Sequence, residues 1–206
     1  VGEEPTGTLK IALPYAPTPP GWNAICREIQ RAYPRLGLEF VHAEEPNDLL
    51  PSRAEIALSF ANEPPEGSRS TMMGEYPMRL VASEHYLATR GAPGSVEELG
   101  AHRLGMWSGP GRAPDVLPLR DGRQLAVDAI LVSDDPRIIQ RAVVAGDCLG
   151  YLPAMPTLDD PALKLLFPDR VAGMASLRLS VPKILAELPR VARFVELGSS
   201  LHPATT

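Results

Sequence analysis

Short continuous apolar runs alternate along this chain with apolar residues at helical spacing. One example begins at residues 129–132, a run of four apolar residues that predicts a buried strand. Ile139, Ala142 and Val143 follow at a spacing that places them on one face of a helix, and residues 149–152 form a second apolar run. A strand, a helix and a strand with short connections indicate a βαβ unit, which implies parallel strands.

The ends of this predicted helix carry clear signals. Asp135 suits the N-cap position, because its carboxylate can accept a hydrogen bond from an N–H group of the first turn. Pro136 suits the first helical position, where no hydrogen bond is lost, and Gly146 suits the position just past the helix end. The end of the first strand and the start of the helix should then face a crevice, where α/β proteins hold their ligands.

A second βαβ unit is predicted near the start of the chain. Residues 9–13 and 38–42 are its strands, and a helix with one apolar face lies between them. The residues of that face are Trp22, Ile25, Cys26, Ile29 and Tyr33. Thr18, in a proline-rich loop, is the expected N-cap of this helix.

The remaining segments continue the same β/α pattern, which predicts an α/β fold. The further predicted strands are 55–60, 71–83 with a break at Pro77, 103–107, 163–167 and 177–181, and the further helices are 84–89 and 189–201. Asp121-Gly122 predicts a hairpin turn that needs positive φ at both positions. Ser95 and Glu98 match the capping-box pattern of a helix start.

Composition narrows the class of protein. The chain has 206 residues, of which 44% are hydrophobic and 22% charged, as is ordinary for a soluble globular protein. Its net charge of −5 argues against a nucleic-acid-binding surface within these residues. No apolar run approaches the roughly 18 residues of a membrane span. Cys26 and Cys148 are far apart in sequence, and we interpret them as two buried free thiols.

The sequence contains no recognisable catalytic or cofactor motif. A Gly-x-Ser-x-Gly nucleophile elbow is absent, and so are His-x-x-x-His and Cys-x-x-Cys pairs that could bind a metal. The glycine-rich loops that hold phosphates are absent too. We therefore expect no enzyme activity, no catalytic residue, no metal and no cofactor.

An ordered set of motifs resembles the effector-binding domain of LysR-type transcriptional regulators. The opening strand Gly7-Thr-Leu-Lys-Ile-Ala and the joint Tyr33-Pro34 before Leu38-Glu39 match the start of that domain. The later matches, in order, are Ala54-Glu-Ile-Ala-Leu58, Val81-Ala-Ser with Tyr86-Leu87, Gly91-x-Pro93, Leu99-x-x-His102-x-Leu104, Ala145-Gly146 through Leu152-Pro153, and Pro189-Arg-Val-Ala-Arg-Phe194. No single piece is specific, but the order and spacing together are.

The resemblance implies a type 2 periplasmic-binding-protein fold with two Rossmann-like lobes and a ligand cleft between them. Lobe I would be residues 8–76 and 177–206, and lobe II residues 77–176. A small-molecule co-inducer would bind in the cleft of a cytoplasmic homodimer. DNA would be bound only through an N-terminal winged helix-turn-helix domain that precedes this chain, and no membrane contact is expected.

Two other functions are compatible with the same residues. A type 2 periplasmic solute-binding protein uses this fold for transport, and a signal peptide encoded upstream would favour it. A stand-alone cytosolic binding module is the third possibility. A winged helix-turn-helix encoded upstream would favour the regulator.

The resemblance also places the effector at strand ends and helix starts. The effector-binding residues expected on this basis are Ala16, Pro17, Thr18, Ser59, Phe60, Met106, Trp107, Ser133, Asp134, Asp135 and Pro153. Several of these have a purely structural alternative, because Thr18, Ser133 and Asp135 could only cap helices. Trp107 and Phe60 could belong to the core, since aromatic residues are mostly buried.

The charges of these segments suggest a ligand class. Pro17, Pro19 and Pro20 remove N–H donors from one wall, and Asp134 with Asp135 brings negative charge to the other. No arginine is identified from the sequence as a compensating cation. We therefore expect a neutral, partly apolar or cationic ligand in preference to a simple dicarboxylate.

Overall fold

The computed structural model describes residues 5–201 and divides the chain into two compact units. Unit 1 comprises the residues up to Glu75 together with those from Ser176 onward, and unit 2 is Tyr76–Ala175. The chain therefore passes between the units twice, within strands β4 (Ser68–Ser83) and β11 (Met174–Pro182). The lobe boundaries expected from the resemblance lie one residue from these.

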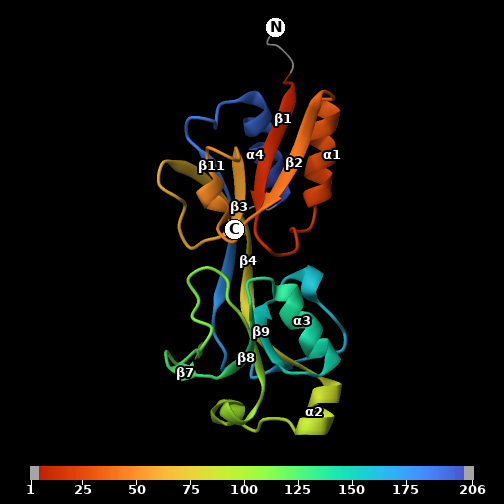
Figure 1. Cartoon of the computed structure of the whole chain (residues 1–206), viewed down its shortest axis with the longest axis vertical. Coiled ribbons are helices and arrows are strands. Elements are labelled where there is room, and N and C mark those ends of the chain that lie inside the picture. Colours follow the sequence, from red (N-terminus) through yellow and green to blue (C-terminus); the bar gives the residue numbers. More distant parts are fainter. Residues whose placement is uncertain (1–4, 202–206) are drawn as a thin grey trace. The chain divides into compact units, whose positions relative to one another are not determined.

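Unit 1 is built on the first βαβ segment. Strand β1 (Gly7–Leu13), helix α1 (Trp22–Ala32) and strand β2 (Leu36–His42) follow one another, and β1 pairs with β2 in parallel (Figure 1). Strand β3 (Ile56–Phe60) pairs with β1 in parallel on its other side, and β11 pairs with β3 in the antiparallel direction. The order in this unit is β2-β1-β3-β11-β4, with a short helical turn η1 (Pro46–Leu49) before β3.

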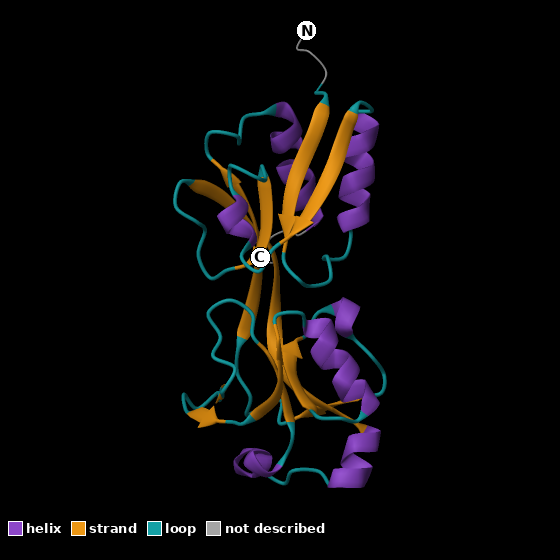
Figure 2. Cartoon of the chain, viewed as in Figure 1, coloured by secondary structure: helices purple, strands orange, loops and turns teal. Residues whose placement is uncertain are grey.

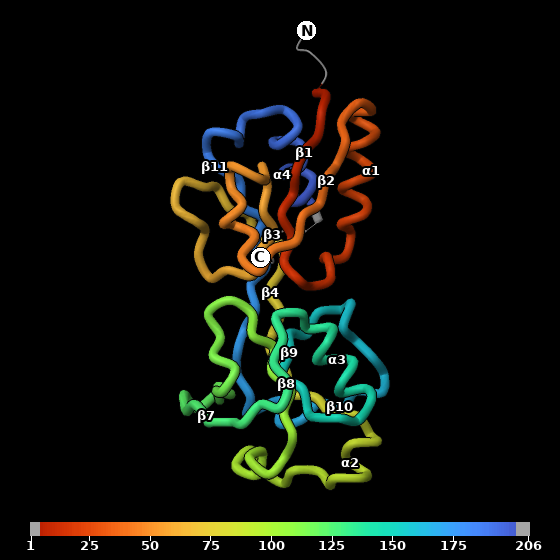
Figure 3. Tube along the Cα trace, viewed as in Figure 1, coloured from red at the N-terminus to blue at the C-terminus, as the bar shows by residue number. Residues whose placement is uncertain are grey.

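The first and last helices share the core of unit 1. Figure 3 shows the red N-terminal strand β1 and the blue C-terminal helix α4 (Pro189–Leu201) in the same unit. The rings of Trp22 in α1 and Phe194 in α4 meet edge to face, with centroids 5.5 Å apart. Aromatic pairs favour this arrangement, and both side chains are buried. Segments from the two ends of the chain therefore depend on each other for burial.

Unit 2 holds a five-stranded sheet in the order β10-β4-β9-β5-β8. Strands β5 (Leu104–Trp107), β8 (Ala129–Ser133) and β9 (Leu149–Pro153) are parallel, whereas β4 and β10 (Leu163–Leu166) are antiparallel to their neighbours. The other elements are α2 (Glu84–Arg90), η2 (Val96–Ala101), the hairpin β6 (Val116–Pro118) and β7 (Gln124–Ala126), α3 (Pro136–Ala145) and η3 (Pro156–Leu158). The predicted β8-α3-β9 unit is confirmed, with β5 between its two strands.

Helix α3 packs very close to the sheet of unit 2 (Figure 2). Two glycines allow this approach, because a Cβ at Gly150 would lie only 2.5 Å from Val143 Cγ2. A Cβ at Gly105 would lie 3.3 Å from Ile139 Cγ2 and 3.1 Å from Cys148 Sγ. Ile139 and Val143 are fully buried at this contact, as their helical spacing predicts.

Four local expectations are wrong. The first concerns Pro77, which does not break strand β4. The pairing of β4 with β9 begins one residue later, at Met78, so no N–H donor is needed at Pro77. The Pro77 carbonyl still accepts a 2.9 Å hydrogen bond from Ala154 N. The second wrong expectation concerns the β6–β7 hairpin. Its connection is longer than the expected two-residue turn, and Gly122 has positive φ whereas Asp121 does not. There the Asp121 carboxylate accepts a 3.0 Å hydrogen bond from Arg123 N.

The other two corrections concern a cap and a strand. Ser95 precedes η2 without a side-chain cap, because the Glu98 carboxylate accepts a hydrogen bond from Gly94 N instead. Strand β8 is not buried, since it lies at the edge of the sheet and leaves Ile130 and Val132 nearly half exposed. Both cysteines are free thiols, but only Cys148 is fully buried, and Cys26 is half-buried.

Among residues 5–201, no helix is both long enough and apolar enough to span a bilayer.

Replacing Gly150 with Ala should destabilise unit 2. The added methyl group would meet Val143, whose branched side chain is held by the buried contact with the sheet. Overpacking of this kind costs about 1–3 kcal/mol. Urea unfolding followed by circular dichroism measures the loss.

Gly100→Ala is the matched control, because a Cβ at Gly100 meets no atom within 4 Å. We expect it to leave the free energy of unfolding nearly unchanged. Equal stability of both variants would show that α3 does not depend on this close approach.

Candidate functional site

The expected residues of unit 1 lie in the loop after β1 and at the end of β3. Ala16 is buried, and Pro17 and Thr18 are half-buried. The alternative that Thr18 caps α1 is wrong, because Gly21, with φ of 85°, is the N-cap and no side chain caps it. Pro19 and Pro20 intervene between Thr18 and the helix, so its hydroxyl is not used for capping.

Ser59 and Phe60 are both buried at the end of β3. The Ser59 hydroxyl accepts a 2.8 Å hydrogen bond from Asn47 Nδ2 of η1. Asn47 was not expected at the site, and its Oδ1 atom is buried without a partner among the described residues. A buried amide oxygen without a donor is unusual, because burying a polar group costs free energy unless it is hydrogen-bonded.

The expected residues of unit 2 gather at the carboxyl ends of parallel strands. Trp107 at the end of β5 pairs in register with Ser133 at the end of β8, and Pro153 ends the neighbouring strand β9. The Trp107 indole Nε1 donates a 2.8 Å hydrogen bond to the Asp134 carbonyl, which ties the ends of β5 and β8 together. Met106 and Trp107 are almost fully buried, so most of the surface of both side chains packs in the core of unit 2.

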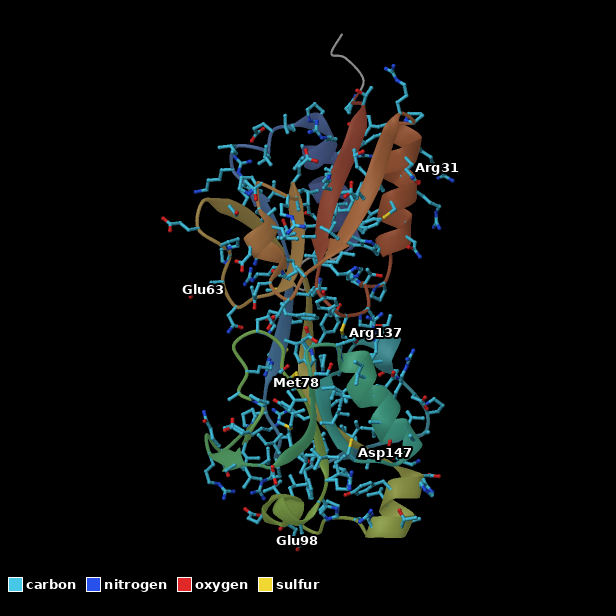
Figure 4. All side chains as sticks on the ribbon, viewed as in Figure 1. Arg31, Glu63, Met78, Glu98, Arg137 and Asp147 are labelled. Carbon is cyan, nitrogen blue, oxygen red and sulfur yellow. The ribbon has the colours of Figure 1, made fainter. Side chains whose placement is uncertain are left out.

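Asp135 is the N-cap of α3, as predicted. Its carboxylate accepts a 2.9 Å hydrogen bond from Arg137 N, and its own N–H donates to Ser133 Oγ over 3.0 Å. The Arg137 guanidinium also donates to both carboxylate oxygens, Nε to Oδ1 over 2.9 Å and Nη2 to Oδ2 over 2.8 Å, at the end of α3 marked by Arg137 in Figure 4. Burial raises the pKa of Asp135, but the hydrogen bonds and charge of Arg137 outweigh it and leave the pKa below its usual value.

The expectation of an acidic wall without a compensating arginine is therefore wrong. Arg137 pairs with Asp135, while Asp134 is exposed and its main-chain carbonyl is used by Trp107. A second arginine, Arg112, lies 5.6 Å from the centre of the Trp107 ring. The absence of an arginine is therefore no longer a ground for preferring a neutral or cationic ligand, and of the two aspartates only Asp134 still contributes an unpaired charge.

Arg112 and Tyr151 are the residues that sequence reasoning missed in unit 2. They line a cavity of about 200 Å³ together with Trp107 and the β6–β7 hairpin. The only sequence signal was the Gly-Pro-Gly turn at residues 109–111, which returns the chain toward the end of β5. Gly109 is needed there, because a Cβ would lie 2.3 Å from the Trp107 ring.

The Tyr151 hydroxyl donates a 2.7 Å hydrogen bond to the Ala172 carbonyl. Burial raises the pKa of Tyr151 to about 12, against a smaller opposite effect of Arg112. The phenol is therefore neutral at physiological pH and adds no negative charge to the cavity.

A larger cavity, of about 560 Å³, lies between β4, β10 and the segment around Asp159 in unit 2. None of the expected effector-binding residues lines it. Both of its arginines are partly engaged, since Arg79 pairs with Asp159 over 2.8 Å and Arg120 Nε donates to the Pro168 carbonyl, while Arg79 Nε is buried without a partner among the described residues. Within residues 5–201, no group of three or more His, Cys, Asp and Glu side chains could hold a metal ion.

Comparisons with known proteins agree with this architecture. The fold is of the type 2 periplasmic-binding-protein kind, and two solved structures share it: the CrgA regulatory domain of Neisseria meningitidis and the full-length virulence activator AphB of Vibrio cholerae. The first superposes with a TM-score of 0.78 at 20% identity, covering 95% of this chain and 98% of that one. The second has a TM-score of 0.79 at 18% identity, covering 97% and 69%.

The chain belongs to the LysR substrate binding domain family, whose model matches residues 2–199. It is thus the effector-binding domain of a LysR-type regulator. The HTH-type transcriptional regulator CrgA of Neisseria meningitidis serogroup C is 30% identical over 118 residues, which cover 54% of this chain. The match spans only 37% of that relative's length.

Removing the Asp135 cap should weaken α3 in a pH-dependent way. Asp135→Ala should cost about 0.5–2 kcal/mol of unfolding free energy at pH 7. Because the folded pKa is lowered, the contribution of the carboxylate is present above the unfolded pKa, about 3.9, and is lost as pH falls through the folded value. Urea unfolding at pH 7 and at pH 3 measures both effects.

Asp135→Asn is the control, because asparagine caps helices about as well but carries no charge. It should lose less stability than the alanine variant at pH 7. A loss of the same size for Asp135→Ala at both pH values would contradict the assigned role of the charge.

Proposed function

We propose that this chain senses a small-molecule effector for a LysR-type transcriptional regulator whose DNA-binding part lies outside these residues. The observation that carries the proposal is the family match over residues 2–199. The name of the relative CrgA, an HTH-type transcriptional regulator, supports it. Solute binding for transport, the alternative, has no such support from the relatives.

The two units are proposed to be the two regulatory lobes, with the effector in the cleft between them. The residues proposed to contact it are the eleven expected ones, together with Asn47 and Arg112. Their placement within each unit supports this role, because they lie at strand ends or beside them, where open α/β sheets bind ligands. The interlobe location itself is proposed from the family resemblance.

Signal transmission is proposed to follow from differential affinity. An effector that binds one arrangement of the lobes or subunits more tightly shifts the population toward that arrangement. This requires no chemistry, which fits a chain whose relatives are regulators and not enzymes. We also propose a cytoplasmic location, because the proposed action on DNA requires access to the chromosome.

A full-length protein that contains this chain should respond to a compound that the chain binds. Trp107→Phe should shift the dose response of a promoter reporter, because it removes the indole N–H bond that joins the ends of β5 and β8. A shift of about threefold or more is expected for the loss of one such bond. Reporter assays and thermal unfolding of the variant are the measurements.

Tyr86→Phe is the matched control. Tyr86 is another buried aromatic residue of unit 2, and its hydroxyl bonds to His102 and to Arg103 N, away from the expected residues. The proposal fails if no compound bound by the chain alters the reporter, or if both variants shift the response equally.

Homodimerisation is proposed to cover two exposed edges. In unit 2, β8 and α3 expose Ile130, Val132, Ile138 and Val144, and in unit 1 the edge strand β2 exposes Phe40. Exposed apolar edge strands invite pairing with another chain. We propose that β2 and α1 of one copy pack against β8 and α3 of its partner.

Val132→Asp should therefore weaken the dimer, because the charge would be buried at the interface. A rise of at least about tenfold in the dissociation constant is expected, measured by size-exclusion chromatography with light scattering. Leu165→Asp is the control, since Leu165 on β10 is also exposed but lies on the opposite edge of the sheet. A chain that is monomeric at high concentration would refute the interface.

A further inference from the structure

The loop after β5 brings a cation into a small cavity of mixed polar and apolar lining. The Arg112 guanidinium lies 5.6 Å from the centre of the Trp107 ring and donates a hydrogen bond to the Met174 carbonyl. Trp107 is itself fixed by its 2.8 Å bond to the Asp134 carbonyl. The cation and its aromatic support are therefore held in place before any ligand arrives, which lowers the cost of binding.

Arg112 is half-buried and lacks an acidic partner within the part of the chain that the structure describes, as does Arg178, whereas several other arginines of the chain are paired. Arg79, Arg137 and Arg190 pair with Asp159, Asp135 and Glu55 at 2.8, 2.8 and 2.5 Å. Across the described residues, 5–201, no carboxylate lies within 4.0 Å of the Arg112 guanidinium. Partial burial of a charge is costly unless the charge is paired, and contact with an indole ring compensates only in part.

The surroundings select the kind of anion. The cavity of about 200 Å³ is smaller than the pockets of drug-sized ligands, roughly 300–1,000 Å³, so its occupant is small. Trp107, Val116 and Pro118 give it apolar walls, while Gln124 and Tyr151 add polar groups. Burial lowers the pKa of Arg112, because its charge is only partly solvated.

We propose that Arg112 binds the carboxylate of a small effector whose short apolar body packs against Trp107, Val116 and Pro118. This inference rests on the proposed effector-binding function and specifies its ligand class as small monocarboxylates. Arginine binds carboxylates through two parallel N–H donors. Inorganic phosphate could use the same donors but has no apolar surface to bury against these walls.

Calorimetric titration of the 206-residue chain tests the proposal. The probes are propionate and benzoate, their uncharged amides propionamide and benzamide, and inorganic phosphate. At least one carboxylate should bind about tenfold to a hundredfold more tightly than its own amide, because only the carboxylate forms the charge-assisted pair. Phosphate should bind more weakly than that carboxylate.

Arg112→Gln should reduce carboxylate affinity by about tenfold or more, and Arg112→Lys should reduce it less, since lysine keeps the charge without the two-donor geometry. Arg120→Gln is the matched control, because Arg120 is an arginine of the same unit that does not line this cavity. It should leave the affinity unchanged. Thermal unfolding of each variant shows that the fold is retained.

Three results would overturn the proposal. These are no carboxylate binding, equal affinity for acid and amide, and undiminished binding by Arg112→Gln. Amide binding that Arg112→Gln leaves unchanged would overturn the ligand class while leaving the effector-binding function intact. The effector-binding function is tested separately by the reporter assay of the full-length protein, and it fails if no compound bound by the chain alters the reporter.

Discussion

The close packing of α3 on β5 and β9 is the contact on which the site of unit 2 depends. Gly105 and Gly150 let Ile139 and Val143 pack closely on the sheet, because a Cβ at either glycine would crowd these side chains. Asp135 then caps the helix beside the ends of β5 and β8. The bond from Trp107 to the Asp134 carbonyl can form only because these ends lie side by side.

The charged side chains of unit 2 differ in whether they have an oppositely charged partner. Asp135 and Arg137 satisfy each other at the helix start, so they contribute structure and little net charge. Arg112 is held over Trp107 without a carboxylate, so its charge remains available to a ligand. The chain's overall net charge of −5 does not reveal this local difference, because it averages over surface ion pairs.

Much of the architecture could be read from local patterns. The apolar runs and helical spacings identified β1, α1 and β2, and also β8, α3 and β9, because burial imposes those periods on sequence. The cap at Asp135 and the glycine after α3 were predictable for the same reason, since both act within a few residues. The break expected at Pro77 was wrong, because whether a proline disrupts a strand depends on which of its groups the neighbouring strand uses.

The sequence by itself determined the α/β pattern, the helix ends and the family to which the chain belongs, since these depend on local spacing and on motif order. Tertiary structure alone decided that β8 is an exposed edge, that Gly21 and not Thr18 caps α1, and that Asn47 meets Ser59. It also brought Arg112 to Trp107. These outcomes depend on contacts between segments far apart in the chain or on the course of loops, and no local period encodes them.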